Sequence, residues 1–213
     1  MANEQDLTPY QQIMLAKGEA LDGYASLESS LALLFSILLS VSQESAYSIF
    51  YRIAAAKSRR AILEDLFSQS SFTRYKPGFD SIMKAVGQLD NERNQVAHWH
   101  TTIGTPIGAN PEKIKGIAIR NPTRPISSDP GTSALTSVDL ARFRDECRYW
   151  SAILSMFIAV VSPAFPRELR PPDADTWPDK FLRPIDNPYR PAPAKKSRRK
   201  NTRRKVPPRS LGR

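Results

Sequence analysis

Proline divides this chain into two parts. Eleven of the eighteen prolines lie within residues 163–213. Proline has no amide hydrogen to donate and disfavours helical geometry in the residue before it, so this stretch is expected to hold no regular structure. It is also poor in apolar residues, which favours extended or disordered chain. We therefore expect a folded domain over residues 8–162, a Pro-rich linker over 163–194 and a disordered tail over 195–213.

The excess charge of the chain lies in that tail. The 213 residues include 31 Lys and Arg against 21 Asp and Glu, a formal charge of +10. Residues 195–213 contain ten basic and no acidic residues, so residues 1–194 hold the remaining 21 basic residues against 21 acidic ones. Such a polycation binds phosphate backbones through counterion release, without reading bases. The residues expected to bind RNA or another nucleic acid are Lys195, Lys196, Arg198, Arg199, Lys200, Arg203, Arg204 and Lys205. Alternatives are a terminus that only improves solubility, or a nuclear-import signal.

Several classes of protein are excluded by what the sequence lacks. A single cysteine, Cys147, rules out an internal disulfide and a zinc site built on Cys pairs. No phosphate-binding glycine loop, nucleophile elbow or metal-ligand spacing is present, so no cofactor is expected. The N-terminus has no basic segment followed by an apolar one. The longest apolar run, Leu31–Val41, is about half the length that crosses a bilayer. We expect a cytoplasmic protein that does not associate with membranes.

Apolar residues at helical spacing predict helices over residues 10–42, 45–56, 57–67, 80–99 and about 136–162. Ser58 is a candidate N-cap for the third segment, although the second and third are alternatively one kinked helix. The pair Pro77-Gly78 is expected to interrupt the chain before the fourth. The last helix has the strongest start signal, with Thr136 or Ser137 as N-cap and Asp139 in the first turn.

Residues 100–134 form a Pro-, Gly- and Thr-rich insertion before the last helix. Within it, Ile114–Ile119 alternates in the manner of a strand, which predicts a hairpin at the end of the bundle. The predicted fold is therefore all-α: a bundle of four or five helices, with this loop or hairpin insertion and the basic tail. Trp177, in the Pro-rich linker, is a candidate for docking that segment on the bundle.

The fourth predicted helix carries an arginine where an apolar residue is expected. Its apolar stripe steps by four, three, four and three residues through Ile82, Val86, Leu89, Arg93 and Val96. A guanidinium on a core-facing position is costly unless it is paired. Such local conflicts tend to mark either a functional site or a buried ion pair.

Polar residues lie beside that stripe. Asn91, Asn94 and His98 share a neighbouring face, and the only other histidine is His100. The structural interpretation is that Arg93 pairs with a buried Glu28 or Glu64. His98 would then only cap carbonyls at the end of the helix.

The string Arg93-Asn94-Gln95-Val96-Ala97-His98 resembles the motif of HEPN domains, in which an Arg is followed by four to six residues and a His. Asn is the usual residue after that Arg. The resemblance implies a homodimer with Arg93 and His98 as catalytic residues in a cleft between protomers, and Asn94 orienting them. It also implies a metal-independent ribonuclease.

The chemistry of these residues fits RNA cleavage by the neighbouring 2′-hydroxyl. Histidine titrates in the range needed for proton transfer, and arginine stabilises the charge on the phosphorane. The expected function is an HEPN-like, RNA-associated protein that acts as a metal-independent endoribonuclease in stress, toxin or phage-defence physiology, with a protein regulator as a further partner. One alternative is a non-catalytic HEPN-type module for dimerisation or for partner or nucleic-acid binding. Another is a DNA-associated protein that uses only its tail.

Deleting residues 195–213 is expected to remove most of the nucleic-acid affinity. Each engaged charge contributes roughly −0.7 to −0.9 to the slope of log affinity against log salt. If about half of the tail's charges engage, affinity falls on the order of a hundredfold as salt rises severalfold. Fluorescence anisotropy with labelled RNA measures this slope for the full-length and the truncated protein. An unchanged slope in the truncated protein would place the binding surface within residues 1–194.

Overall fold

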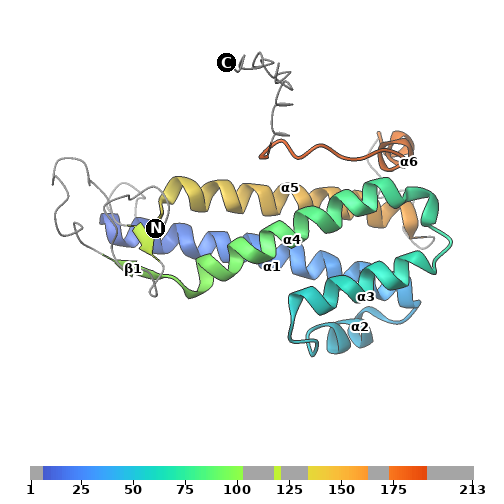
Figure 1. Ribbon diagram of the computed structural model, residues 1–213, viewed down its shortest axis with the longest axis horizontal. Helices are drawn as coiled ribbons and strands as arrows, with labels where there is room; N and C mark the ends of the chain where they lie inside the picture. Colours follow the sequence, from blue (N-terminus) through green and yellow to red (C-terminus); the bar gives the residue numbers. More distant parts are fainter. Residues whose placement is uncertain (1–6, 103–117, 121–133, 163–172, 191–213) are drawn as a thin grey trace, which may run out of the picture.

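The computed structural model describes residues 7–102, 118–120, 134–162 and 173–190. Three long helices lie side by side in this part of the chain: α1 (Pro9–Leu39), α4 (Lys76–His98) and α5 (Ser137–Val161). The shorter α2 (Gln43–Phe50) and α3 (Ala56–Ser68) lie on one side of them and α6 (Trp177–Phe181) on the other (Figure 1). The predicted helical bundle is confirmed, with six helices in the described residues rather than four or five.

The ends of α1 and α5 follow from local capping. Thr8 and Gln11 form a capping box at the start of α1, and Thr136 and Asp139 form one at the start of α5. The predicted N-cap of the last helix is thus Thr136. Helix α1 ends at Ser40, which adopts the left-handed conformation with φ of 55°. Helix α5 ends at Val161, before Ser162, as predicted.

Two expectations about the middle of the chain are wrong. Helix α3 begins at Ala56 with Ala55 in the N-cap position, so Ser58 is not its cap. Ser42 instead caps α2, accepting a hydrogen bond from the Ser45 amide at 3.2 Å. The two segments are also not one kinked helix, because non-helical residues 51–55 separate them.

Helix α4 begins at Lys76, four residues before the predicted start at Asp80. Pro77 occupies the first turn, where its missing amide hydrogen would have no partner in the helix. Gly78 packs directly against α6, since a Cβ there would lie 2.9 Å from both Cα and the carbonyl oxygen of Phe181. The Pro77-Gly78 pair therefore starts α4 rather than interrupting the chain before it.

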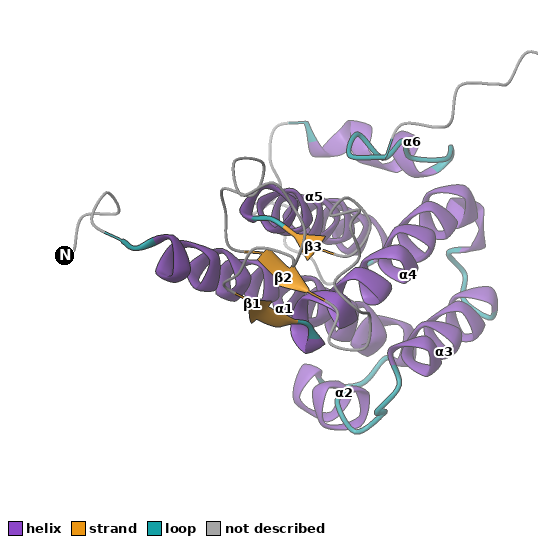
Figure 2. Cartoon of the chain, turned by 60° about the vertical axis from the view of Figure 1, so that its left-hand side comes forward, coloured by secondary structure: helices purple, strands orange, loops and turns teal. Residues whose placement is uncertain are grey.

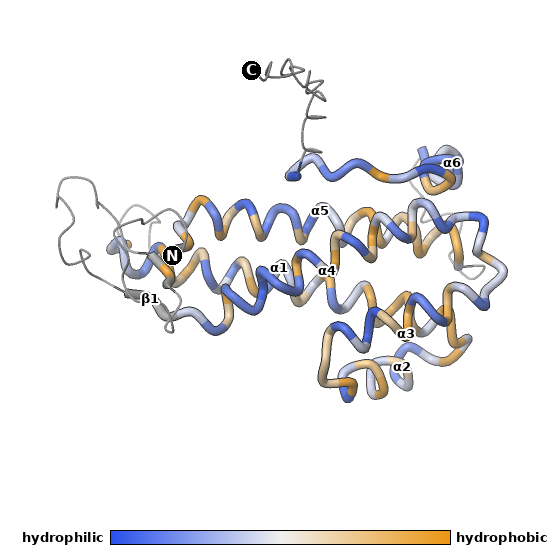
Figure 3. Tube along the Cα trace, in the orientation of Figure 1, coloured by the Kyte–Doolittle hydropathy of each residue, from blue (hydrophilic) through white to orange (hydrophobic). Residues whose placement is uncertain are grey.

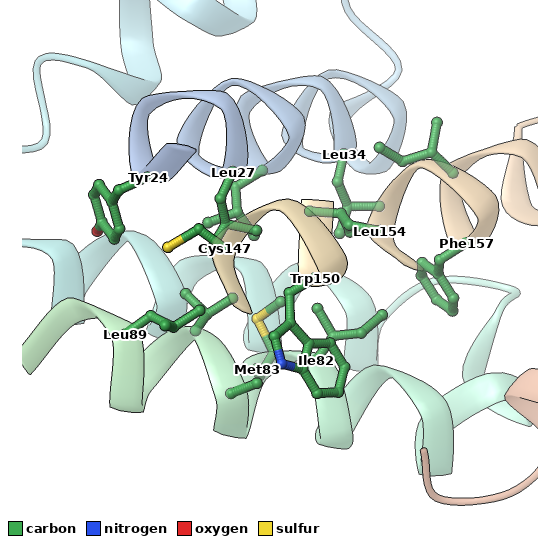
Figure 4. Close-up of a cluster of buried hydrophobic side chains, with 14 of the residues drawn as sticks. Tyr24, Leu27, Leu34, Ile82, Met83, Leu89, Cys147, Trp150, Leu154 and Phe157 are labelled. Carbon is green, nitrogen blue, oxygen red and sulfur yellow. The ribbon is translucent and has the colours of Figure 1, made fainter. Parts of the chain in front are cut away.

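The core lies between the three long helices. Helix α1 makes its most extensive contact with α5, and α4 covers the seam between them. Apolar and polar residues alternate along each long helix, as expected for helices with one buried face (Figure 3). The buried side chains at its centre include Tyr24, Leu27, Leu34, Ile82, Met83, Leu89, Cys147, Trp150, Leu154 and Phe157 (Figure 4). Burial, with Glu146 and Glu92 nearby, raises the pKa of Cys147 to about 12, so its thiol stays protonated at neutral pH.

Two of the three long helices run in the same direction around this core, and the third runs the opposite way. Ser30 contacts Ser151 and Glu19 pairs with Arg144, so α5 runs parallel to α1. Lys17 reaches the carbonyl of Trp99, while Tyr24 reaches Asp90, which lies about two and a half turns earlier in the chain, so α4 runs antiparallel to α1. The C-terminal end of α4 therefore meets the N-terminal half of α1.

Helix α1 is long and apolar enough, by length and composition, to cross a membrane. In the structure its apolar side packs on α5, and 44% of the apolar window is buried inside the protein. The core helix of a bundle has the same composition, so the absence of a membrane association stays a prediction.

Three short strands lie at the end of the bundle where α4 ends and α5 begins (Figure 2). They are β1 (His100–Thr102), β2 (Ala118–Arg120) and β3 (Ala134–Leu135), paired antiparallel in that order. Ile119 is fully buried. Of the predicted strand Ile114–Ile119, only Ala118 and Ile119 belong to the described residues, and both lie in β2.

The described part of the Pro-rich linker contains regular structure. Asp173–Arg190, which we name the C-terminal strap, includes the 3-10 turn Ala174–Thr176 and α6. The expectation of no regular structure is wrong here, because Pro178 lies in the first turn of α6, where proline is tolerated. Trp177 and Phe181 are buried against the bundle, in line with the docking role predicted for Trp177.

A cluster of ion pairs joins the C-terminal end of the strap to α4 and α5. Glu146 of α5 is 0% exposed, and its carboxylate accepts from Arg190 Nε at 2.7 Å and from Asn187 Nδ2 at 2.8 Å. Arg190 also pairs with Glu92 of α4, and Arg142 bridges Glu92 and Glu146. Burying one carboxylate is tolerable because both of its oxygens have charged partners. The predicted tail, residues 195–213, lies outside the described residues.

Replacing Gly78 with alanine is expected to destabilise the protein by about 1–3 kcal/mol, because the new Cβ must push the Phe181 backbone away. Gly18→Ala is the matched control, since nothing lies within 4 Å of a Cβ at that helical position. It is expected to stabilise by about 0.5–1 kcal/mol. Urea unfolding measures both. A Gly78→Ala protein as stable as the control would contradict the close docking of α6.

Candidate functional site

The predicted site residues lie in the last two turns of α4. Arg93 is half-buried, whereas Asn94 and His98 are exposed, and His98 is the last residue of the helix. The backbone of His100 belongs to β1. The site thus lies on the surface at the end of the bundle that carries the sheet.

The side chain of Arg93 is held on an aromatic ring. Its guanidinium carbon lies 5.7 Å from the centroid of the Tyr24 ring, within the range of a cation–π contact. Its Nη1 lies 3.4 Å from Asn94 Oδ1, a long hydrogen bond. Arg93 makes no ion pair with any described residue. The structural interpretation, in which it pairs with Glu28 or Glu64, is therefore wrong for this part of the chain, and Glu28 instead pairs with Arg59 at 2.8 Å.

Tyr24 is itself fixed by a buried acid. Its hydroxyl donates a 2.6 Å hydrogen bond to Asp90 Oδ1, three residues before Arg93 in α4. Burial, together with Asp90, raises the pKa of Tyr24 well above its usual range, so the hydroxyl remains a donor at every physiological pH. The ring that carries Arg93 thus has a fixed orientation.

Arg60 of α3 completes this arrangement. Its Nη1 lies 3.3 Å from Asp90 Oδ2, an ion-pair distance whose geometry does not make a hydrogen bond. A Cβ at Gly87 would overlap the Arg60 guanidinium, so the absence of a side chain there lets Arg60 cross α4 to reach Asp90. Sequence reasoning missed these supporting residues. The only signal for them was the position of Asp90 one turn before Arg93.

Arg93 and His98 do not converge within one chain. Five residues of α-helix correspond to a rotation of about 140° between their side chains. Asn94 and His98, four residues apart, share a face instead. Of the predicted catalytic residues, the structure brings Arg93 and Asn94 together and leaves His98 apart.

The end of α4 is capped by a residue other than His98. Lys17 of α1 donates a 3.1 Å hydrogen bond to the carbonyl of Trp99. His98 makes no hydrogen bond to any residue of the described ranges, which argues against the interpretation that it caps carbonyls. Its imidazole is free to meet a ligand.

Arg93 differs from the other half-buried arginines. Six arginines in the described ranges are half-buried, and five of them form ion pairs with carboxylates: Arg59, Arg60, Arg142, Arg144 and Arg190. Arg93 alone among the six has none. An arginine fixed on an aromatic ring with unused donors is suited to bind a phosphate.

Metal chemistry finds no support in the described residues, where no three His, Cys, Asp or Glu side chains gather to hold an ion. The expected nucleic-acid-binding residues of the tail lie outside the described ranges. No protein-family model, curated protein or solved structure matches this chain.

Proposed function

We propose that this is an HEPN-like, RNA-associated protein in which Arg93 contacts the phosphodiester backbone. The observation that carries the proposal is that Arg93 is the one half-buried arginine of the described residues without a carboxylate partner. Tyr24 holds it in place, so little side-chain entropy is lost when a phosphate binds. The basic tail supplies affinity that does not depend on sequence.

In the catalytic form of this proposal, Arg93 and His98 cleave RNA without a metal. His98 accepts the proton of the attacking 2′-hydroxyl or donates a proton to the leaving 5′-oxygen, and Arg93 stabilises the charge on the phosphorane. Asn94, in contact with Arg93, orients the guanidinium. Because Arg93 and His98 diverge on α4, the complete site requires a second copy of the chain, placed by a two-fold axis.

The same divergence favours a second candidate, a non-catalytic HEPN-type module. In this form Arg93, Asn94 and His98 only bind nucleic acid or a protein partner. The exposed side chains of Asn94 and His98, which share a face, suit such contacts. A protein regulator and a role in stress or defence physiology belong to both forms, as does the cytoplasmic location.

His98→Ala is expected to lower RNA cleavage by a factor of roughly 10²–10⁴, the usual contribution of a general acid or base. Its stability should change by less than about 0.5 kcal/mol, because the side chain is exposed and makes no hydrogen bond to a described residue. Asn91→Ala is the matched control, since Asn91 is exposed on the same helix two turns away. Gel assays of RNA cleavage with and without EDTA, alongside anisotropy, give the readouts.

Three results separate the candidates. Cleavage that is lost in His98→Ala and Arg93→Lys, but persists in Asn91→Ala and in EDTA, supports the endoribonuclease. Absence of cleavage in every protein, with weaker RNA binding in Arg93→Ala, supports the non-catalytic module. Cleavage and RNA binding that are both unaffected by substitution of Arg93 and His98 would contradict the proposal in both forms.

A further inference from the structure

A second concave site lies along the middle of α4, on the N-terminal side of Arg93 and His98. A cleft of about 670 Å³ separates the C-terminal strap from the bundle. One wall is a stripe of α4 that includes Ser81, Lys84 and Gln88. Trp150 of α5 belongs to a second wall. The third wall consists of strap residues between Pro184 and Arg190. The volume is in the range of pockets that hold small organic ligands.

The strap is fixed at three points around this cleft, so it does not simply lie loosely on the surface. Phe181 is 1% exposed in the core at one end, and Arg190 is paired with Glu146 and Glu92 at the other. Between them, the Ile185 amide donates a 3.0 Å hydrogen bond to Ser81 Oγ. Three fixed points hold the cleft open in a defined shape.

Three donors in the wall, on Trp150, Lys84 and Gln88, have no partner among the described residues. Trp150 is 1% exposed, yet its indole N–H is buried without a hydrogen-bond acceptor. Buried polar groups in folded proteins are almost always satisfied, and an orphaned one calls for a water or a ligand. Lys84 projects from α4 with no carboxylate and no hydrogen bond in the described ranges. Of the other polar wall groups, Ser81 and Asn187 are already bonded within the protein, whereas the Gln88 amide makes no hydrogen bond with the described residues.

One carboxylate in the wall is also unused. The Asp186 side chain is exposed at the cleft and makes no ion pair or hydrogen bond with the described residues. Accessible apolar surface comes from Pro184, Ile185 and Pro188 of the strap, since Ala85 and Trp150 are almost completely buried. The wall therefore combines a cation, a carboxylate, a donor at the indole and apolar side chains of the strap.

We propose that this cleft, between the C-terminal strap and α4, binds a nucleoside monophosphate. The phosphate pairs with Lys84, the base lies against Ile185 with one edge toward the indole N–H of Trp150, and an exocyclic amino group donates to Asp186. A ring nitrogen of the base is the acceptor that Trp150 lacks. This site does not include Arg93 or His98, so its test is independent of the test of the proposed function.

The test is calorimetric titration of the full-length protein with AMP, with adenosine and inosine monophosphate as companion probes. Adenosine lacks the phosphate, and inosine monophosphate has a carbonyl in place of the amino group. Lys84→Met is expected to weaken AMP binding about tenfold or more, the effect of losing one charge-assisted hydrogen bond. The matched control is Lys57→Met on α3, an exposed lysine that likewise has no ion pair among the described residues.

Both lysine variants retain the basic tail, so any binding of AMP to the tail is equal in the two proteins. Binding weakened in Lys84→Met but unchanged in Lys57→Met supports the site, as does an AMP-induced change in tryptophan fluorescence that Trp150→Phe abolishes. Lys84 is exposed, so its substitution should leave the fold intact even if Trp150→Phe does not. No saturable binding at millimolar AMP, or equal binding by the two lysine variants, would overturn the proposal.

Discussion

The contact between α1 and α5 positions the rest of the molecule. The two helices run parallel and bury a continuous apolar seam that includes Leu27, Leu34, Leu154 and Phe157. Gly23 lets them approach closely, because a Cβ there would lie 3.3 Å from the Arg144 carbonyl oxygen. Helix α4 covers this seam, and its register brings Asp90 beside Tyr24 and Arg93 over the same ring. The geometry of the candidate site therefore follows from the packing of the core.

Ion pairs between the helices add directional contacts to the apolar packing of the core. Glu28–Arg59 and Asp90–Arg60 join α3 to α1 and α4. The Glu92, Arg142, Glu146 and Arg190 cluster joins α4, α5 and the strap. Because these half-buried charges are matched, the unmatched guanidinium of Arg93 is informative about function. A phosphate bound in the proposed way would give Arg93 the negatively charged partner that no described carboxylate provides.

Features determined by local sequence were predicted well. The N-cap at Thr136 or Ser137, the stop at Ser162 and the apolar periodicity of α1 are all readable within one turn or a few turns of helix. The start of α4 was missed because Pro and Gly have two uses: they interrupt helices, and they also suit a first turn and a close helix contact. Helix α6 was missed because it owes its stability to the burial of Trp177 and Phe181 on a distant surface.

For the candidate site, the sequence singled out Arg93 and His98, but the support from Tyr24, Asp90 and Arg60 depends on three helices meeting in space. The angle between Arg93 and His98 was implicit in their five-residue spacing.

The central claim is that Arg93 is held ready for a phosphate group. The most direct test records the Nε–Hε resonances of the arginine side chains by NMR in the full-length protein, with Arg93 assigned from the signal missing in Arg93→Lys. On addition of a short single-stranded RNA, we expect the Arg93 resonance to shift in proportion to the bound fraction, together with those of the tail. Shifts confined to the other arginines, with the Arg93 resonance unchanged at saturation, would contradict the account.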